Sequence, residues 1–517
     1  MNLEITFDLP GLLVIGLALG SAGVWWRLGG VSADMRLHQL APDVYVYRGF
    51  FSNSAVFVLP RSVVVIDTQT TPEVALRLRR QIAAVTDKPI LHVINTHYHG
   101  DHVGGNGAFP EATVIAPEET ARFVVERDGE RAEYCHTFGL HLQGMPPVRG
   151  PDRTFRGEME LEIDGEKLVI AQIGRNETPD ACVVRWPSRG VVAVGDGVAT
   201  DQYPWLGVPF LDEGFQDDGQ WLGYLRTIRG WRPSVLIPGH GRPLVGERTV
   251  ASRLKLLEEL LEALLREVRL EIGRKTLLPE LVLRVDRRLR HYRLRPELAE
   301  RVVSQRFAIF RAYNSLHPDR RGKGWWHELR PPVIRVPDAA ELAAATAGAE
   351  GGALLQRARR FVRKDRPLAL ALLAKYLEKN PDDAEVWAER AEIEMAGAIR
   401  TRPIVDASEY IAAAGRSATR ALQLRPGQPL ASLNQGIVEV WGALVTGQAM
   451  DRALERLEAA LAAPELTWLQ RLRGRFFLAK AHQAEGRDAA SDESFRALLG
   501  PLRFLDRLLL PRLRTLP

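Results

Sequence analysis

The sequence from residue 95 to residue 106 is Asn-Thr-His-Tyr-His-Gly-Asp-His-Val-Gly-Gly-Asn. Four potential metal ligands fall within six of these residues, namely His97, His99, Asp101 and His102. Imidazole and carboxylate groups are ligands that suit zinc and related divalent ions. In an extended segment alternate side chains point the same way. His97 and His99 are therefore expected to reach one metal position, while Asp101 and His102 reach a neighbouring one. The spacing therefore predicts a site for two metal ions.

The residues before this motif predict an α/β fold. Short β-branched runs at 44–47, 55–59 and 63–67 are typical of paired strands in one sheet. Residues 72–86 have the apolar spacing of a helix, and the apolar run at 90–94 predicts a buried strand. The order of strand, helix, strand and motif places the ligands at the carboxyl end of a strand, where α/β proteins commonly build their sites.

Further ligand-type residues follow strand-like runs later in the chain. The alternating run at 161–173 leads into a turn that contains Glu177. Two later apolar runs end at Asp196 and at His240. Each of these short motifs is weak evidence for a metal site when it is taken alone. Their order after the histidine-rich motif is what supports a resemblance to a known superfamily.

Taken together, the motifs resemble those of the metallo-β-lactamase superfamily over roughly residues 37–250. The resemblance implies an αβ/βα sandwich of two mixed sheets with outer helices. It also implies that Asp67 orients a ligand histidine, although a strand-end cap is an equally simple role for this residue. The ligands implied for the first metal are His97, His99 and Glu177. Those implied for the second metal are Asp101, His102 and His240. Asp196 is implied to bridge the two metals.

Glu177 stands where most branches of the superfamily have a histidine. A glutamate can bind zinc at nearly the same distance as an imidazole, so a working site is expected rather than a degenerate one. The alkylsulfatase group resembles this chain in using a carboxylate at this position. The resemblance implies two Zn²⁺ ions, with other divalent metals possible, that activate a water as hydroxide to cleave an ester such as an alkyl sulfate. Asp101 is the expected proton acceptor.

The segment after Asp196 leaves the substrate open. Residues 197–225 contain no Lys or Arg to bind an anionic group, unless Arg149 or Arg175 reaches it. The same segment is rich in aromatic residues, which would line an apolar part of a small-molecule ester or belong to the core. Alternatives within the superfamily are a lactonase, a β-lactamase and a thioester hydrolase. An alternative of another class is a membrane-tethered interaction scaffold with a structural metal site.

The rest of the chain predicts helices. Residues 251–345 resemble the helical dimerisation domain that follows the catalytic domain of alkylsulfatases, which implies a homodimer. Residues 346–517 read as helical pairs without a regular 34-residue period, and we interpret them as a tetratricopeptide-like array. The formal net charge of +5 includes no dense basic stripe, so nucleic acid is not an expected partner.

Residues 1–30 contain an uncharged run from 9 to 26 that ends in two tryptophans. Its length and aromatic end predict a single membrane anchor, with a signal peptide or a buried helix as alternatives. Arginines after the run place the bulk of the protein on the cytoplasmic rather than the periplasmic side by the positive-inside rule.

Overall fold

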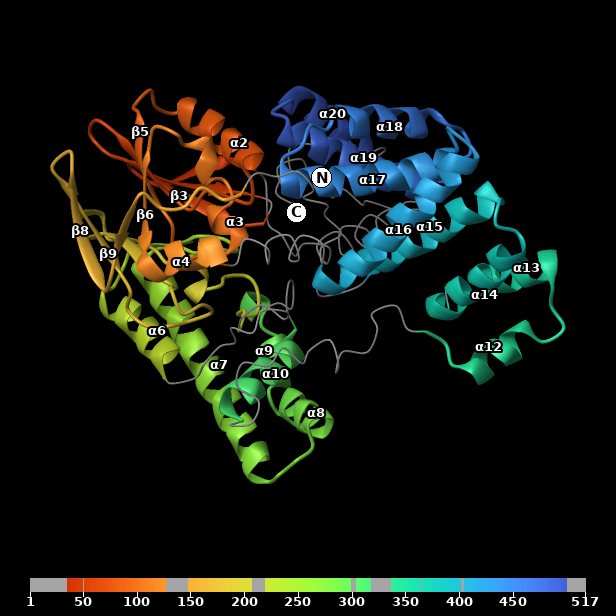
Figure 1. The fold of residues 1–517 in the computed structure, drawn as a ribbon, viewed down its shortest axis with the longest axis horizontal. Coiled ribbons are helices and arrows are strands. Elements are labelled where there is room, and N and C mark those ends of the chain that lie inside the picture. Colours follow the sequence, from red (N-terminus) through yellow and green to blue (C-terminus); the bar gives the residue numbers. More distant parts are fainter. Residues whose placement is uncertain are drawn as a thin grey trace, which may run out of the picture.

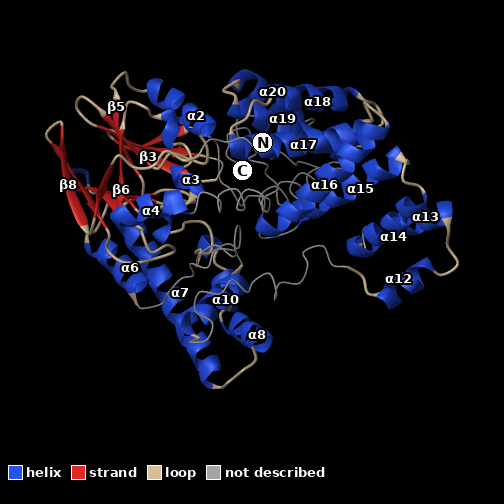
Figure 2. Ribbon diagram, in the orientation of Figure 1, coloured by secondary structure: helices blue, strands red, loops and turns tan. Residues whose placement is uncertain are grey.

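The computed structural model describes residues 35–49, 51–126, 147–206, 219–298, 304–317, 336–362, 364–400 and 404–499. Within these residues the chain forms a lobe that contains two β-sheets, followed by helices that extend into a second lobe (Figure 1). All the described strands belong to the first lobe (Figure 2).

The first sheet has seven strands that follow one another in chain order. Neighbouring strands from β1 to β4 are antiparallel, and those from β4 to β7 are parallel. The parallel part requires crossovers, and helix α2 (Pro72–Ala83) forms the one between β4 and β5. The strands are β1 (Leu37–Ala41), β2 (Val44–Arg48), β3 (Asn53–Val58), β4 (Val63–Ile66), β5 (Ile90–Ile94), β6 (Thr113–Pro117) and β7 (Arg153–Phe155).

The second sheet has six strands in the order β13-β12-β11-β10-β9-β8. Only β11 and β12 are parallel neighbours, because helix α6 (Gln220–Gly230) connects them. Strands β9, β11 and β12 therefore run in the same direction and end at the same edge of the sheet. The strands are β8 (Glu158–Ile163), β9 (Glu166–Ala171), β10 (Val183–Trp186), β11 (Val191–Ala193), β12 (Val235–Ile237) and β13 (Leu244–Val245).

The two sheets pack face to face through alternate residues of their strands. Ile66 and Phe57 from the first sheet share a buried apolar cluster with Trp186 and Ile170 from the second, and the rings of Phe57 and Trp186 lie 5.3 Å apart. The opposite faces pack against helices, α2 and α4 (Glu118–Glu126) on the first sheet and α6 and α7 (Glu247–Gly273) on the second. The predicted αβ/βα sandwich followed by a helical region is confirmed.

Helical pairs make up the C-terminal region, and they begin at residues 351, 384, 429 and 468, so their spacing is irregular. The domain limits and the homodimer that the sequence suggests stay predictions. After α7 the helices are α8 (Leu278–Arg288), α9 (Arg290–Arg293), α10 (Gln305–Leu316), α12 (Ala339–Thr346), α13 (Gly351–Phe361), α14 (Arg366–Lys379), α15 (Ala384–Arg400), α16 (Ile404–Leu424), α17 (Pro429–Thr446), α18 (Asp451–Ala462), α19 (Trp468–Ala484) and α20 (Asp488–Leu499).

The prediction of a membrane-anchored protein needs correction. Among the described residues, no helix combines the length and the apolar character needed to cross a bilayer. The run from 9 to 26 that suggested an anchor lies outside the described residues. Neither the anchor nor the location derived from it is retained.

Candidate metal centre

The histidine-rich motif occupies the carboxyl end of β5. The strand ends at Ile94, and His97 and His99 follow in the loop, while Asp101 and His102 lie on the short helix α3 (Gly100–Val103). Cys182 N donates to Thr96 O, which ties this loop to the second sheet. The loop is therefore fixed from both sheets of the sandwich.

The other three ligand-type residues come from the second sheet. Glu177 lies in the turn after β9, Asp196 in the short 3-10 helix η3 (Gly195–Gly197) after β11, and His240 in the turn after β12. Because these three strands end at the same edge, the residues that follow them meet there. Residues far apart in sequence thus face the motif after β5.

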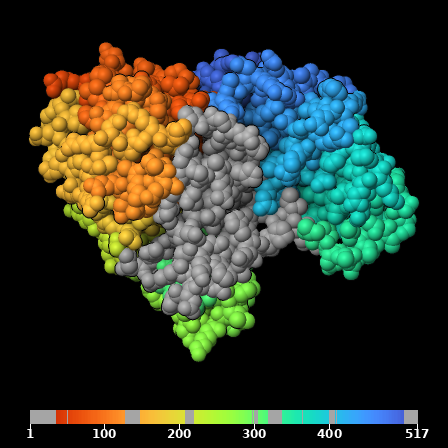
Figure 3. Space-filling model, in the orientation of Figure 1, coloured from red at the N-terminus to blue at the C-terminus, as the bar shows by residue number. Residues whose placement is uncertain are grey.

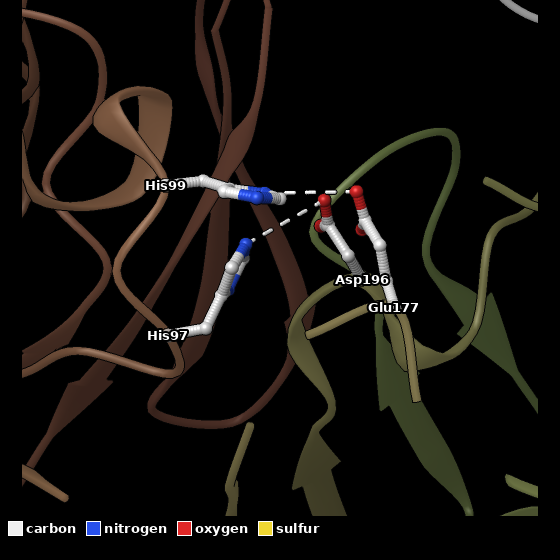
Figure 4. A group of neighbouring side chains, drawn as sticks. All are labelled: His97, His99, Glu177 and Asp196. Atoms are coloured by element: carbon white, nitrogen blue, oxygen red, sulfur yellow. Dashed lines mark ion pairs between the residues drawn. The ribbon is translucent and has the colours of Figure 1, made fainter. Parts of the chain in front are cut away.

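His97, His99, Glu177 and Asp196 form the first group of side chains. Figure 4 shows the two histidines on one side and the two carboxylates facing them from the other. His99 Nδ1 lies 3.6 Å from Glu177 Oε1, and His97 Nε2 lies 3.8 Å from Asp196 Oδ2. All four residues offer ligand atoms that lie within 4.8 Å of one another. This arrangement can hold one metal ion.

Asp101, His102 and His240 form the second group. Asp101 Oδ2 lies 3.4 Å from the Nε2 atoms of both histidines. Asp196 also lies close to this group, with its Oδ1 atom 3.3 Å from His102 Nε2 and its Oδ2 atom 3.0 Å from His240 Nε2. Asp196 therefore lies between the two groups, where the sequence analysis expected a bridging carboxylate.

The site contains buried polar atoms that need partners. Within the described part of the chain, five of them have no hydrogen-bond partner: His97 Nε2, Asp101 Oδ2, His102 Nε2, Glu177 Oε2 and Asp196 Oδ1. Leaving such atoms unsatisfied is costly, and it is uncommon in folded proteins. All five are nitrogen or oxygen atoms of the kind that bind divalent metals, so the residues present fit a metal centre.

Burial and mutual charge set the protonation of these groups. Burial lowers the pKa of His97 well below its ordinary value and that of His99 to about 4, so both imidazoles are neutral near pH 7. Burial also lowers the pKa of His102, but the neighbouring carboxylates outweigh it and raise that pKa well above the ordinary value. Burial, followed by the charge of Asp196, raises the pKa of Glu177.

Hydrogen bonds at the back of the site orient three of the histidines. Asp67 Oδ2 lies 2.8 Å from His102 Nδ1, and Asp67 also accepts hydrogen bonds from the backbone N–H and the hydroxyl of Thr96. Thr96 Oγ1 lies 3.0 Å from His97 Nδ1, and His240 Nδ1 lies 2.8 Å from the carbonyl oxygen of Phe51. These contacts direct the Nε2 atoms toward the centre. Asp67 thus both orients a histidine and caps the loop.

Backbones approach the site closely at glycines. A Cβ atom on Gly239 would lie 2.0 Å from Asp196 Oδ1 and 2.9 Å from His102 Cε1. A Cβ atom on Gly104 would lie 1.9 Å from Thr70 O. These separations are far shorter than van der Waals contact, so both positions require glycine.

Aromatic residues after Asp196 support the site from the core. Trp221 Nε1 donates to Gly197 O at 2.9 Å and Tyr224 OH donates to Val194 O at 2.7 Å, so both side chains brace the segment that carries Asp196. The ring of Trp205 stacks against that of His240 at 6.3 Å. Tyr203 is also buried in the core, and the other two aromatic residues of this segment, Phe210 and Phe215, lie outside the described residues.

An arginine from a distant helix reaches the segment that lacks basic residues. Arg253 of α7 is buried, and its Nη2 atom donates to Ala199 O at 2.8 Å. In the described part of the chain its Nε and Nη1 atoms have no hydrogen-bond partner. Arg149 binds Asp152 and two backbone carbonyls instead. Sequence reasoning missed Arg253, because nothing in a leucine-rich helix marks which of its arginines turns inward.

Comparison with known proteins places this site in a family. Residues 47–240 match the model of the metallo-β-lactamase superfamily. The chain is 24% identical over 234 residues to a linear primary-alkylsulfatase from Pseudomonas sp., covering 39% of this chain and 43% of that protein. It is 26% identical over 266 residues to the alkyl/aryl-sulfatase BDS1 of Saccharomyces cerevisiae, covering 44% of this chain and 41% of that protein. The chain thus spans less than half the length of these relatives.

A solved structure shares the fold over a larger part of the chain. The stereoselective inverting sec-alkylsulfatase Pisa1 from Pseudomonas sp. superposes with a TM-score of 0.52 and 19% sequence identity, covering 76% of this chain and 66% of that one. At this identity the likeness concerns the fold alone. Residues 47–240 are therefore a domain of the metallo-β-lactamase superfamily, similar in sequence to the corresponding part of alkylsulfatases.

Proposed function

We propose that this protein is a two-zinc metallohydrolase that cleaves an ester-type substrate, and that an alkyl sulfate ester is the substrate class. The observation that carries the proposal is the convergence of seven ligand-type side chains, five of which bear buried atoms without a hydrogen-bond partner among the described residues. The likeness of the domain to alkylsulfatases supports the choice of sulfate esters.

The seven side chains divide into two ligand sets. His97, His99 and Glu177 would hold one zinc ion, Asp101, His102 and His240 would hold the other, and Asp196 would serve both. When bound, the two ions supply Lewis acidity and lower the pKa of a water toward neutrality. Asp101 remains a carboxylate, because the charges of His102 and His240 outweigh its burial and lower its pKa. We assign Asp101 as the acceptor of the proton that leaves the attacking water.

Arg253 supports an anionic substrate. Its guanidinium lies against Ala199, three residues beyond Asp196, and it retains two buried N–H donors without a hydrogen-bond partner in the described residues. Burial lowers the pKa of Arg253 to about 10, which leaves the side chain positively charged near pH 7. A sulfate group accepts hydrogen bonds from such donors. In this proposal, α7 would supply the basic group that residues 197–225 lack in sequence.

Neutral esters are the second candidate class, and the absence of Lys and Arg between residues 197 and 225 favours them. The deciding experiment is a hydrolysis screen of purified zinc-loaded protein against alkyl sulfates, phosphodiesters, lactones and thioesters. We expect turnover of alkyl sulfates and its loss in His99→Ala. Turnover of neutral esters alone would contradict the proposed substrate class.

Arg253→Met tests the role of the arginine while it keeps most of the buried volume. We expect KM for an alkyl sulfate to rise by about ten- to a hundredfold, because a hydrogen bond to a charged group contributes about 1.5–3 kcal/mol. A neutral ester hydrolysed by the same protein is the matched control, and its KM should change little. Equal effects on both substrates would remove Arg253 from substrate binding.

A further inference from the structure

The metal motif is packed directly against a buried loop, residues 67–71, that links β4 to α2. Thr68 N donates to His102 O at 2.7 Å, and Gly105 N donates to Gln69 O at 3.1 Å. Asp67, at the start of this loop, contacts His102 Nδ1 at 2.8 Å. Any displacement of the loop therefore changes the orientation of a proposed ligand.

Two residues of this loop adopt strained backbone conformations. Asp67 and Gln69 have φ angles of 62° and 72°, in the left-handed region that non-glycine residues rarely occupy. Such conformations persist only when the surrounding structure holds them in place. Gln69 Nε2 donates to Ser54 Oγ at 2.7 Å, which secures the middle of the loop. The end of the loop at Thr71 is held by a contact with the C-terminal helices.

Thr71 joins the loop to the C-terminal helices. Its hydroxyl oxygen accepts a hydrogen bond from Val74 N as the N-cap of α2 and donates one to the carbonyl oxygen of Thr446 at 2.6 Å. Thr446 is the last residue of α17. Gly447, which follows it with a φ angle of 76°, lies so close that a Cβ atom would be 2.6 Å from Val74 N.

Arg77, in the second turn of α2, makes the second contact with the array. It is buried, and its Nη2 atom donates to Glu485 Oε1 at 3.0 Å and to the carbonyl oxygen of Gly447 at 3.4 Å. Figure 3 shows the first lobe adjoining the C-terminal helices near the top of the view. The array thus holds both the beginning and the second turn of α2.

We infer that the helical array is a positioning element for the metal centre. The turn formed by residues 446–448 holds Thr71 and Arg77, which fix the strained loop and keep Asp67 against His102. This inference rests on the proposed function, because it assumes that His102 binds zinc. Thr71 and Arg77 are positioning residues that touch neither metal nor substrate.

The test measures zinc affinity of the full-length protein by competition with a chromogenic chelator. We expect Thr71→Val, which keeps the shape but removes the hydroxyl, and Arg77→Met to weaken zinc binding by about three- to tenfold, at or below the low end of the 10–100-fold typical of residues that contact a ligand directly. Asp67→Asn is the comparison for a residue that contacts a proposed ligand directly. Thr71→Ser, which restores the hydroxyl, should recover wild-type affinity.

Asp488→Asn is the matched control for the interface. Asp488 pairs with Arg36 at an exposed position and is not among the contacts to residues 67–71 described above, so its loss should leave zinc affinity unchanged. The unfolding temperature of each zinc-free protein is measured in parallel. Wild-type zinc affinity in folded Thr71→Val and Arg77→Met proteins, with only a lower unfolding temperature, would overturn the inference. If Thr71→Val does not fold, Arg77→Met decides alone.

Failure of the inference can be told apart from failure of the proposed function. Zinc binding that is weakened in both variants supports the inference even if no ester is hydrolysed, and that result contradicts only the proposed activity. Wild-type protein that binds no zinc contradicts the metal centre and with it the inference. In an active enzyme we also expect kcat to fall while KM stays unchanged, since the contacts lie behind the ligands.

Discussion

Glu177 and Asp196 place two buried carboxylates next to each other, facing His97 and His99. Two like charges in a buried site destabilise each other, and the raised pKa of Glu177 reflects this together with its burial. A bound cation removes that repulsion. We therefore expect these carboxylates to contribute to stability mainly when metal is present.

Glu177→Gln tests this residue with little change in shape. The amide is a much weaker metal ligand than a carboxylate, so we expect metal content to fall from about two zinc ions per chain to about one. Elemental analysis after dialysis measures the content. Glu177→His, which restores a strong ligand, is the control and should bind about two ions. Full metal content in Glu177→Gln would show that Glu177 is not a ligand.

The protonation of the metal-free site predicts how zinc binding depends on pH. Glu177 and His102 have raised pKa values, so protons compete with zinc for both groups. Zinc affinity should therefore increase as pH rises. In the metal-free protein, Glu177 binds its proton more tightly in the folded state than in the unfolded state. Its contribution to stability is therefore lost as pH rises above the ordinary glutamate pKa of 4.5 and through the raised pKa of the folded state.

Thermal unfolding with zinc and with a chelator, compared between pH 6 and pH 8, checks this dependence. We expect the gap between the two unfolding temperatures to widen as pH rises. The lowered pKa of His99, about 4, adds no zinc-linked proton in this range, because this imidazole is already neutral. A gap that narrows with rising pH would contradict the assigned protonation states.

Among the structural elements, the turn after β12 illustrates how backbone geometry defines the site. Gly239 lets the chain pass beside Asp196 and deliver His240. Because the strand itself is only three residues long, the position of His240 depends on this turn. In this turn Gly239 N donates a hydrogen bond to Gly195 O at 2.7 Å, which ties the turn to the segment that carries Asp196.

Gly239→Ala is expected to displace Asp196. The new Cβ atom would lie 2.0 Å from Asp196 Oδ1, so the carboxylate must move, and zinc affinity should fall by at least about tenfold. Chelator competition measures the affinity. Gly223→Ala on α6 is the control, because its Cβ meets nothing within 4 Å. That exposed helical position should gain about 0.4–1 kcal/mol of stability with unchanged zinc affinity.

Across the whole molecule, the two lobes should be energetically coupled through α2. Coupling between two sites is reciprocal, so a contact that strengthens zinc binding is itself strengthened by zinc. The turn at residues 446–448 should therefore be more stable in the zinc-bound protein. This follows from the positioning role proposed for the helical array.

Backbone amide hydrogen exchange, compared between the zinc-bound protein and the protein treated with a chelator, measures this coupling. We expect chelation to increase exchange at residues 67–71 and at 446–448, because local opening of either segment releases the other. Amides beside the buried Ser417–Glu394 hydrogen bond, which links α16 to α15 within the array, are the control and should not change. Unchanged exchange at 446–448 would show that the lobes are joined but not coupled.

Several elements were predictable because their signals are local. The apolar run at 90–94 coincides with β5, and the predicted helix at 72–86 corresponds to α2. Strands β6, β7 and β10 were not predicted. Their short apolar runs carry too little periodicity to separate a strand from a buried loop. The predicted anchor at 9–26 rested on the length and composition of one apolar run, which do not determine where that run lies.

The sequence by itself determined the kinds of ligand and the order in which they follow the strands, since both depend on residue type and short-range spacing. The family resemblance implied a bridging position for Asp196, but only the tertiary structure decided that Arg253 reaches the segment after it. The contact of Thr71 with Thr446, 375 residues away, belongs with this feature. Such contacts depend on how distant elements pack, and no local pattern in the chain encodes them.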